Sequence, residues 1–424
     1  MKTVVKILLV GSIGLATNFV KAQEKVATES VSRTFQFTFI TPLGTNGVES
    51  GNITNNLSLN LLAGYNGGLK GVEVGFFANI LKGNMDGAQF AGFSNINLKT
   101  GKGFQGAGFL NYNHNGFRGA QLSGFANVVL SNANGFQGST FANVVNGNLK
   151  GTQLSGFANV VTDSIDGFQG AVFANYSKSN THGQVSGFAN FNFSDTKGPQ
   201  IAVFGNINTG NLSSVQLSGF ANINTKSLHG AQIASFFNYA KKLNGLQLGV
   251  FNYVDTLEKG ASVGLISFVR NGYHVFEISS NESMYGVLSY KTGTRSFYNI
   301  LSLGASAKND RIYWGWGYGI GTIVPINGKT DINFEATSFQ VNDDEWYTDR
   351  LNLHNRLNVL VSVKLSDNIT IFGGPSWNVL VSDITDKHGN IIKSDYAPWH
   401  VFNKTYNKDT NVKMYPGFSV GIRF

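Results

Sequence analysis

Residues 119–129 read GAQLSGFANVV, and variants of this stretch recur along almost half of the chain. Alternation places Ala120 and Leu122 on one face and Gln121 and Ser123 on the other, which is the two-residue period of a β-strand. Gly, Asn, Asp and Ser collect between successive copies, where their conformational preferences favour turns. Each copy therefore predicts either one strand of about ten residues with a turn, or two short strands with two turns.

The repeat runs from Gly71 to Val254 with the form Gly-x-Gln-x-(Ser/Ala)-Gly-Phe-Ala-Asn-(Val/Ile/Tyr). Such a period is read before any local pattern because it sets the architecture. Its markers are a Phe and an Asn two positions later, and the Asn markers are spaced 16 residues from copy to copy as far as Asn238, apart from one 15-residue step. A shorter step leads to Asn252. We assign a structural repeat role to Phe77, Asn79, Phe93, Asn95, Phe109, Asn111, Phe125, Asn127, Phe141, Asn143, Phe157, Asn159, Phe173, Asn175, Phe188, Asn190, Phe204, Asn206, Phe220 and Asn222.

Two architectures are compatible with this repeat. Units that begin GFQG, at Gly103, Gly135 and Gly167, alternate with G(A/T)QLSG-type units and so give a second period of 32 residues. Antiparallel hairpins would produce such alternation because their up and down strands meet opposite membrane interfaces, and this favours repeat strands in the wall of a β-barrel. The alternative is a β-solenoid with Phe, Gln and Asn ladders. The position of Phe125 favours the solenoid. In a barrel this side chain would point into the lumen, which is usually polar.

The C-terminal part has longer alternating runs that predict about eight strands. They are YHVFEISS, MYGVLSY, SFYNILSLGAS, IYWGWGYGIGTI, TDINFEATSFQ, RLNVLVSVKLS, ITIFGGPSWNVLVS and MYPGFSVGIRF. The last run ends with an apolar face and an aromatic terminal residue, a C-terminal barrel signal formed by Phe418, Val420, Ile422 and Phe424. Upstream of the repeats, FQFTFITPLG and LSLNLLAGYN predict two more strands, the first of which could pair with the last and close the sheet.

The N-terminus has the layout of a secretory signal peptide over residues 1–22. Lys2 and Lys6 precede an apolar run from Ile7 to Val20, and Ala22 offers a small residue for cleavage. The chain contains no Cys, which excludes disulfides and thiolate metal sites. The sequence therefore predicts an exported protein that is held together by backbone pairing and packing.

The repeat GxQxSGFANV, flanked by LNLLAGYNGG and FGGPSWNVL, resembles bacterial surface-repeat proteins with Gly-x-Gln-x-Gly-x-Phe-Asn units. The C-terminal region resembles outer-membrane β-barrels in general. The resemblance implies a location at the bacterial outer membrane and cell surface. Its implied partners are outer-membrane lipid and, through the C-terminal strand, the barrel-assembly machinery. It implies no chemistry.

The sequence marks no catalytic, cofactor-binding or metal-binding residue. The seven His are dispersed, and the acidic groups at Asp343–Glu345 and at Asp383, Asp386 and His388 lack the spacing of a calcium loop. The glycine-rich GWGYGIG at 315–321 has no following helix to present to a phosphate. Lys and Arg form no stripe of the kind that binds nucleic acid. We therefore expect a protein that is not an enzyme.

The sequence predicts four regions: a signal peptide (1–22), N-terminal strands (23–70), a 16-residue β-repeat region (71–269) and C-terminal β-barrel strands (270–424). The predicted fold is all-β, an antiparallel outer-membrane β-barrel that includes the repeat strands, with β-solenoid repeats on a smaller barrel as the alternative. The predicted function is a passive channel or structural surface protein. The alternative is a surface-exposed binding or adhesion module anchored by the smaller barrel.

Overall fold

A computed structural model describes residues 31–180, 182–308, 311–383, 396–406 and 410–424. The predicted signal peptide lies outside these residues. The chain divides into two compact units, residues 1–136 and 137–424. Over the described residues the structure is built of β-strands with one short 3-10 helix. No helix in this part of the chain has the length and apolarity needed to cross a membrane.

The first unit begins with three strands and the 3-10 helix: β1 (Val31–Ile40), β2 (Leu43–Gly44), η1 (Gly47–Asn52) and β3 (Ile53–Asn66). Strand β1 lies parallel to β3 and pairs antiparallel with β2. The prediction that the first strand pairs with the last is therefore wrong. The last strand pairs instead with strands of its own C-terminal sheet.

Each following coil of the first unit contains a longer and a shorter strand. The longer strands are β4 (Gly68–Gly75), β6 (Met85–Ala91), β8 (Gly101–Ala107) and β10 (Phe117–Ser123). The shorter strands are β5 (Ala78–Leu81), β7 (Ser94–Asn97), β9 (Leu110–Asn113) and β11 (Ala126–Val129). Every strand pairs in parallel with its equivalent one coil later, so that Asn95 lies beside Asn111 and Gln105 beside Gln121.

The second unit continues with the same two series of strands. The longer series comprises β14 (Leu149–Ser155), β16 (Ser164–Ala171), β19 (Gly183–Ser186), β21 (Gln200–Ala202) and β23 (Val215–Ser218). The shorter series comprises β13 (Ala142–Val145), β15 (Ala158–Val161), β17 (Ala174–Ser177), β20 (Ala189–Asn192) and β22 (Gly205–Asn208). Strand β12 (Ala133–Ser139) belongs to the longer series, where it pairs with β10 and β14, and the short β18 (Ser179–Asn180) pairs with β16 of that series. The two series merge into single strands in β24 (Ala221–Ala234), β25 (Phe237–Leu248) and β26 (Phe251–Val263), and β27 (Ile266–Val269) ends the region.

The repeats form a parallel β-solenoid of about 13 turns over residues 54–269, so the predicted antiparallel barrel of repeat strands is wrong. The physical reason lies at Gly124 and Phe125, where a bend separates β10 from β11. Uninterrupted alternation would place Phe125 on the same face as Gln121 and Asn127. At the bend Phe125 points out instead, while Gln121 and Asn127 both point inward. The reading of one unit as two short strands and two turns is the correct one.

The 32-residue alternation comes from packing on the outer face of the longer strands, and not from hairpins. Phe168 precedes the buried Gln169 and Gly170 follows it, whereas the previous coil has Thr152 and Leu154 at these positions. A Cβ on Gly170 would lie 2.9 Å from Leu154 and 3.3 Å from the Phe168 ring. In the GFQG coils the Phe before the Gln is thus matched by a Gly after it, and this packing between neighbouring coils accounts for the alternation without hairpins.

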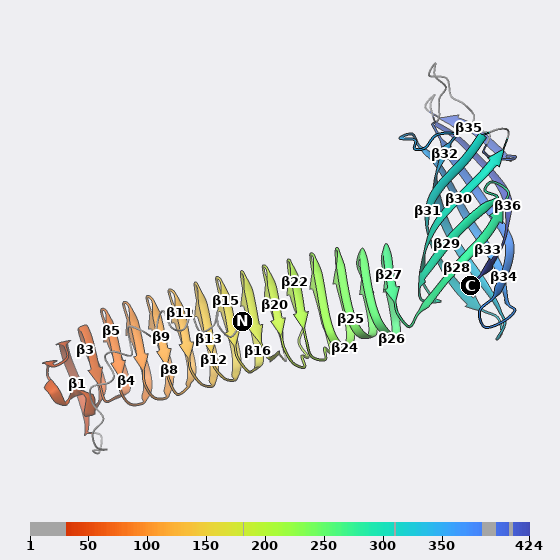
Figure 1. Cartoon of the computed structure of the whole chain (residues 1–424). Helices are drawn as coiled ribbons and strands as arrows, with labels where there is room; N and C mark the ends of the chain where they lie inside the picture. The colour runs from red at the N-terminus through yellow and green to blue at the C-terminus, as the bar shows by residue number, and fades with distance from the viewer. Residues whose placement is uncertain (1–30, 181, 309–310, 384–395, 407–409) are drawn as a thin grey trace. The chain divides into compact units, whose positions relative to one another are not determined.

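The C-terminal part of the second unit is a nine-stranded antiparallel sheet, drawn in green to blue in Figure 1. Its strands are β28 (Tyr273–Asn281), β29 (Gly286–Gly293), β30 (Tyr298–Lys308), β31 (Arg311–Pro325), β32 (Thr330–Asp343), β33 (Asn352–Lys364), β34 (Thr370–Ser382), β35 (Phe402–Tyr406) and β36 (Thr410–Arg423). The eight alternating runs of the sequence correspond to all of these except β35. Strand β36 pairs with β34 on one side and with β28 on the other, so the sheet closes on itself.

Candidate functional site

A column of Gln side chains runs through the interior of the solenoid. Each Gln donates from Nε2 to Oε1 of the Gln one coil earlier, as Gln105 does to Gln89 over 2.8 Å and Gln121 to Gln105 over 2.9 Å. In the second unit the same bond, 2.7–3.4 Å long, is donated by Gln153, Gln169, Gln184, Gln200, Gln216, Gln232 and Gln247. Stacking at the spacing of parallel strands thus satisfies amides whose burial would otherwise be costly.

The first position of the Gln column is occupied by Glu73, a fully buried carboxylate. Its Oε2 accepts from Gln89 over 2.8 Å, and its Oε1 accepts from Ser58, Asn60 and Asn66 over 2.6–3.0 Å. Burial raises the pKa of Glu73, and these four hydrogen bonds act in the opposite direction. A carboxylate accepts without donating, so it suits the one position of the column that has only donors around it.

A second column consists of Asn side chains, and its bonds point the other way. Each Asn donates from Nδ2 to Oδ1 of the Asn one coil later, over 2.9 Å from Asn79 to Asn95 and from Asn159 to Asn175. The same Nδ2 also reaches a backbone carbonyl, that of Gly170 over 2.7 Å in the case of Asn159. The Gln and Asn columns therefore carry amide dipoles of opposite direction along the solenoid.

The repeat Phe side chains form a third column, on the outside. In the first unit Phe93 stacks on Phe77 and Phe109 with ring centroids 4.8 Å apart, and in the second Phe157 stacks on Phe173 at the same distance. Each ring covers the faces of its neighbours but keeps about two fifths of its side chain exposed, for example 41 % in Phe157. The column presents ring edges to the surroundings, an apolar stripe that suits contact with another apolar surface.

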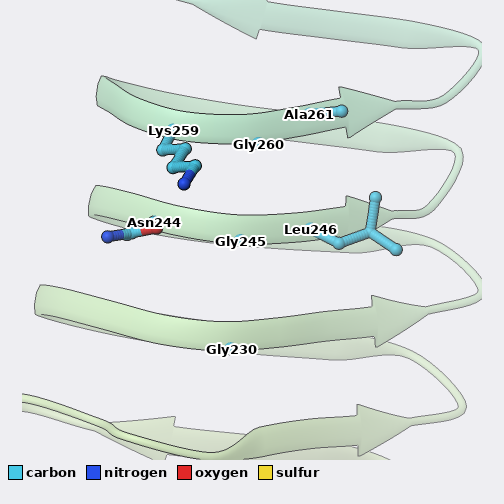
Figure 2. Close-up of a pocket in the computed structure, with 7 residues that line it drawn as sticks. All are labelled: Gly230, Asn244, Gly245, Leu246, Lys259, Gly260 and Ala261. Atoms are coloured by element: carbon cyan, nitrogen blue, oxygen red, sulfur yellow. The ribbon is translucent and has the colours of Figure 1, made fainter.

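Glycines open a hollow on the surface of β24, β25 and β26 (Figure 2). Gly230, Gly245 and Gly260 lie in its floor, and Asn244, Leu246, Lys259 and Ala261 complete its lining. Gly245 has φ +150°, and a Cβ there would lie 1.8 Å from the carbonyl oxygen of Gly230. Lys259 is the only ionisable residue of this lining, so the hollow has no acid–base pair for catalysis.

Charged side chains fill the interior of the closed C-terminal sheet. Lys291 Nζ lies 2.5 Å from Glu277 and 2.6 Å from Glu335. Arg423 binds the same two carboxylates over 2.7 and 3.2 Å, and Tyr298 donates to Glu335 over 2.7 Å. Lys291 and Tyr298 are fully buried. Each charge is therefore paired inside the sheet, which is the condition under which charges tolerate burial.

A second interior group lies around His354. The Tyr396 hydroxyl lies 2.9 Å from His354 Nδ1, and Asn378 Oδ1 lies 3.0 Å from Nε2. Arg356 donates to Asn378 over 2.9 Å and lies 3.6 Å from Glu282. These side chains bond to one another, so this part of the interior is also packed with polar groups.

The outside of the same sheet is apolar. Leu303, Leu357 and Phe418 expose more than half of their side chains. The exposed set further includes Phe276, Ile278, Leu288, Leu301, Ile312, Trp316, Ile320, Phe334, Val359, Val361, Ile371, Trp377, Val420, Ile422 and Phe424. The interior combines the charged groups with a buried apolar cluster that includes Met284, Phe339 and Val341. Charged groups inside and a largely apolar outside differ from the usual arrangement of a water-soluble protein.

The repeat residues named from the sequence fall into two of these columns, the exposed Phe and the buried Asn. The terminal residues Phe418, Val420, Ile422 and Phe424 lie on the apolar outside of the closed sheet. Glu73 was missed, although its signal is a Glu at the Gln position of the first repeat unit, GVEVG. The interior charges were missed too, and their signal is a charge on the polar face of an alternating run, as in YHVFEISS.

Within the described residues, no group of three His, Asp or Glu side chains is placed to hold a metal ion. Of the acidic candidates, Asp386 and His388 lie outside the described residues, and Asp343 pairs with Arg311 over 3.1 Å. Comparison of the chain with family models, with curated proteins and with solved structures gives no match.

Proposed function

We propose that this chain is an outer-membrane protein in which the closed C-terminal sheet spans the bilayer and anchors a non-enzymatic β-solenoid that serves as a binding module. The proposal rests on one observation, that the C-terminal sheet has charged groups inside and apolar side chains outside. Its exposed Leu303 and Leu357 suit contact with lipid tails, and its buried Lys291–Glu335 pair has no need of solvent. The closed ring has eight strands, because β35 pairs beside the start of β36 and is not part of the ring. A barrel of eight strands is just wide enough for side chains to fill its interior.

Closure of the sheet supports the same proposal. In lipid every backbone N–H and C=O must find a partner within the protein, and a closed sheet leaves no open edge. The pairing of β28 with β36, from Glu277 opposite Arg423 to Asn281 opposite Ser419, supplies this closure. We propose outer-membrane lipid as a partner of this sheet, and barrel-assembly machinery as a transient partner through the exposed Phe418, Val420 and Ile422 of β36.

The filled interior favours an anchor over a passive channel. Lys291, Tyr298, Glu335 and Arg423 bond to one another across the lumen. A solute would have to break these buried charge pairs, at a cost of several kcal/mol for each.

The solenoid is the part that we propose to bind. Its Phe column keeps an apolar stripe exposed over many coils, and a large exposed apolar patch usually marks an interaction site. Replacing Phe157, Phe173 and Phe188 with Ser should leave the amide columns intact, because these rings lie outside them. The test is photo-crosslinking in cells from a probe at Val172. We expect a discrete adduct in the wild type that is lost in the triple variant, and an unchanged adduct would contradict a role for the stripe.

The anchor is tested by placing a charge on each apolar surface. Leu303→Arg puts a cation on the outside of the closed sheet, where insertion into lipid should cost about 2–4 kcal/mol near the bilayer centre. Val203→Arg is the matched control, since Val203 is 70 % exposed in the solenoid. Folding of the full chain into phosphatidylcholine vesicles, followed by urea titration, should show the loss for Leu303→Arg alone. An equal response of both variants would contradict the anchor.

A further inference from the structure

The two ends of the C-terminal barrel differ. One end, here called the turn end, contains the start of β28 at Tyr273 and the chain terminus at Phe424, because eight strands bring the chain back to its starting side. Phe276 and Phe424 exchange both backbone hydrogen bonds there, over 3.2 and 2.9 Å. The connections at this end are short, residues 294–297, 326–329 and 365–369.

The opposite end, here called the loop end, contains the long connections. These are residues 344–351, between β32 and β33, and residues 383–401, which lead to β35. Their described parts expose large aromatic side chains, with Trp346 87 % exposed and Tyr347 67 % exposed. In outer-membrane barrels the short turns face the periplasm and the longer loops face the outside of the cell.

The last coil of the solenoid is bonded to the turn end. Ser267 donates its backbone N–H to Asn299 Oδ1 over 2.8 Å, and Thr292 donates to the Ser267 carbonyl over 3.3 Å. His274 Nε2 lies 2.6 Å from the carbonyl oxygen of Val269. Thr292 and Asn299 flank the short connection 294–297, so these bonds place the last coil at this end.

The link between the solenoid and the barrel is too short to cross the membrane. Strand β27 ends at Val269 and β28 begins at Tyr273, which leaves residues 270–272 between them. Three extended residues reach at most about 11 Å. The hydrocarbon core of a bilayer is about 30 Å thick, and the lumen is filled by the Lys291–Glu335 group. The solenoid must therefore leave the membrane on the side of the turn end.

We propose that the repeat region lies in the periplasm, on the inner side of the outer membrane, and not on the cell surface. This inference rests on the proposed membrane anchor. A periplasmic location replaces the expectation of surface-exposed repeats, and it changes which partners the repeats can reach. The Phe column would then contact an apolar surface on a component of the bacterium's own envelope, and not another cell.

The test uses single cysteines in the full chain, which has none of its own. Tyr347→Cys reports on the loop end, and Val172→Cys and Val203→Cys, at positions 71 % and 70 % exposed in the wild type, report on the repeats. Intact cells are treated with a membrane-impermeant maleimide, before and after permeabilisation of the outer membrane. We expect Tyr347→Cys to react in intact cells and the two repeat cysteines to react only after permeabilisation.

Two outcomes would overturn the inference. Reaction of the repeat cysteines in intact cells would place the solenoid outside, and failure of Tyr347→Cys to react there would mean that the loop end does not face outward. Carbonate extraction of the same cells shows whether the sidedness alone is wrong or the membrane anchor is wrong as well. A protein that stays in the membrane pellet keeps its anchor whichever side the repeats occupy, whereas release into the supernatant would refute the anchor and the sidedness together.

Discussion

Gln89 donates a hydrogen bond from Nε2 to Oε2 of Glu73 over 2.8 Å, and this bond gives the Gln column its first acceptor. Burial raises the pKa of Glu73 above the ordinary carboxyl value of about 4.3. At pH values between the ordinary pKa and the raised pKa, Glu73 is protonated in the folded chain and ionised in the unfolded chain. The free energy of unfolding should therefore fall as the pH rises through this window.

The matching prediction concerns Glu73→Gln, which removes the titrating group and keeps the shape of the side chain. We expect the stability of the wild type relative to Glu73→Gln to decline as the pH rises above about 4.3. Pulse proteolysis of the repeat region in urea, at several pH values, measures this difference. Glu49→Gln changes an exposed carboxyl of the same unit and should keep the wild-type pH dependence. If the stability of Glu73→Gln changed with pH in the same way as that of the wild type, the prediction would be wrong.

Lys291→Met tests the buried charges of the barrel. The substitution leaves Glu277 and Glu335 with Arg423 as their only cation, and breaking a buried pair in this way costs about 3–5 kcal/mol. Urea unfolding of the protein in lipid vesicles should register this loss. Lys364→Met is the control, because its pair with Asp367 is exposed and such pairs contribute about 0–1 kcal/mol. A loss no larger than that of the control would mean that the interior charges are not held as described.

Asn159→Ala tests the Asn column. The change removes the acceptor that Asn143 Nδ2 uses beside the carbonyl of Leu154, and the donor that Asn159 supplies to the buried Oδ1 of Asn175. Loss of a hydrogen-bond partner in a buried site costs about 1–3 kcal/mol, so a single substitution is informative even though the other coils keep their own Asn. Asn146→Ala removes an exposed amide that bonds Thr162, and should change stability by less than about 0.5 kcal/mol. Pulse proteolysis of both variants provides the measurement, and equal stabilities would refute a structural role for the ladder.

Gly245→Ala tests the backbone of the longer strands. Its φ of +150° and the carbonyl oxygen 1.8 Å from the new Cβ predict a loss of about 1–3 kcal/mol or more. Gly328→Ala is the control, because nothing lies within 4 Å of a Cβ at Gly328. Thermal unfolding followed by circular dichroism compares the two variants. A stable Gly245→Ala protein would show that the strand can adopt another backbone conformation there.

The sequence predicted the strands better than their arrangement. Alternation located the C-terminal strands, since a strand with one apolar and one polar face has this pattern wherever it is used. Alternation says nothing of the direction of pairing. In the repeats, the choice between barrel strands and solenoid coils depended on a bend at Gly124 and Phe125. This bend separates two strands within one apparent run. The outward position of Phe125, between the inward Gln121 and Asn127, follows from that bend.

The interior charges could be predicted only in part. Glu277 and Arg423 occupy the polar faces of their own runs, but their sequence separation hides the fact that β28 and β36 lie side by side. The pairing arises when the sheet closes, and closure is a property of all the strands together.

The opposed directions of the Gln and Asn bonds have a consequence for the length of the solenoid. A single column of aligned amides would accumulate an electrical polarity with every added coil, and its two ends would become increasingly costly to terminate. Two columns that donate in opposite directions cancel this polarity coil by coil, as Gln105 and Asn95 do with their neighbours. Duplication or loss of a 16-residue segment therefore changes the reach of the protein without changing the electrostatics of its ends.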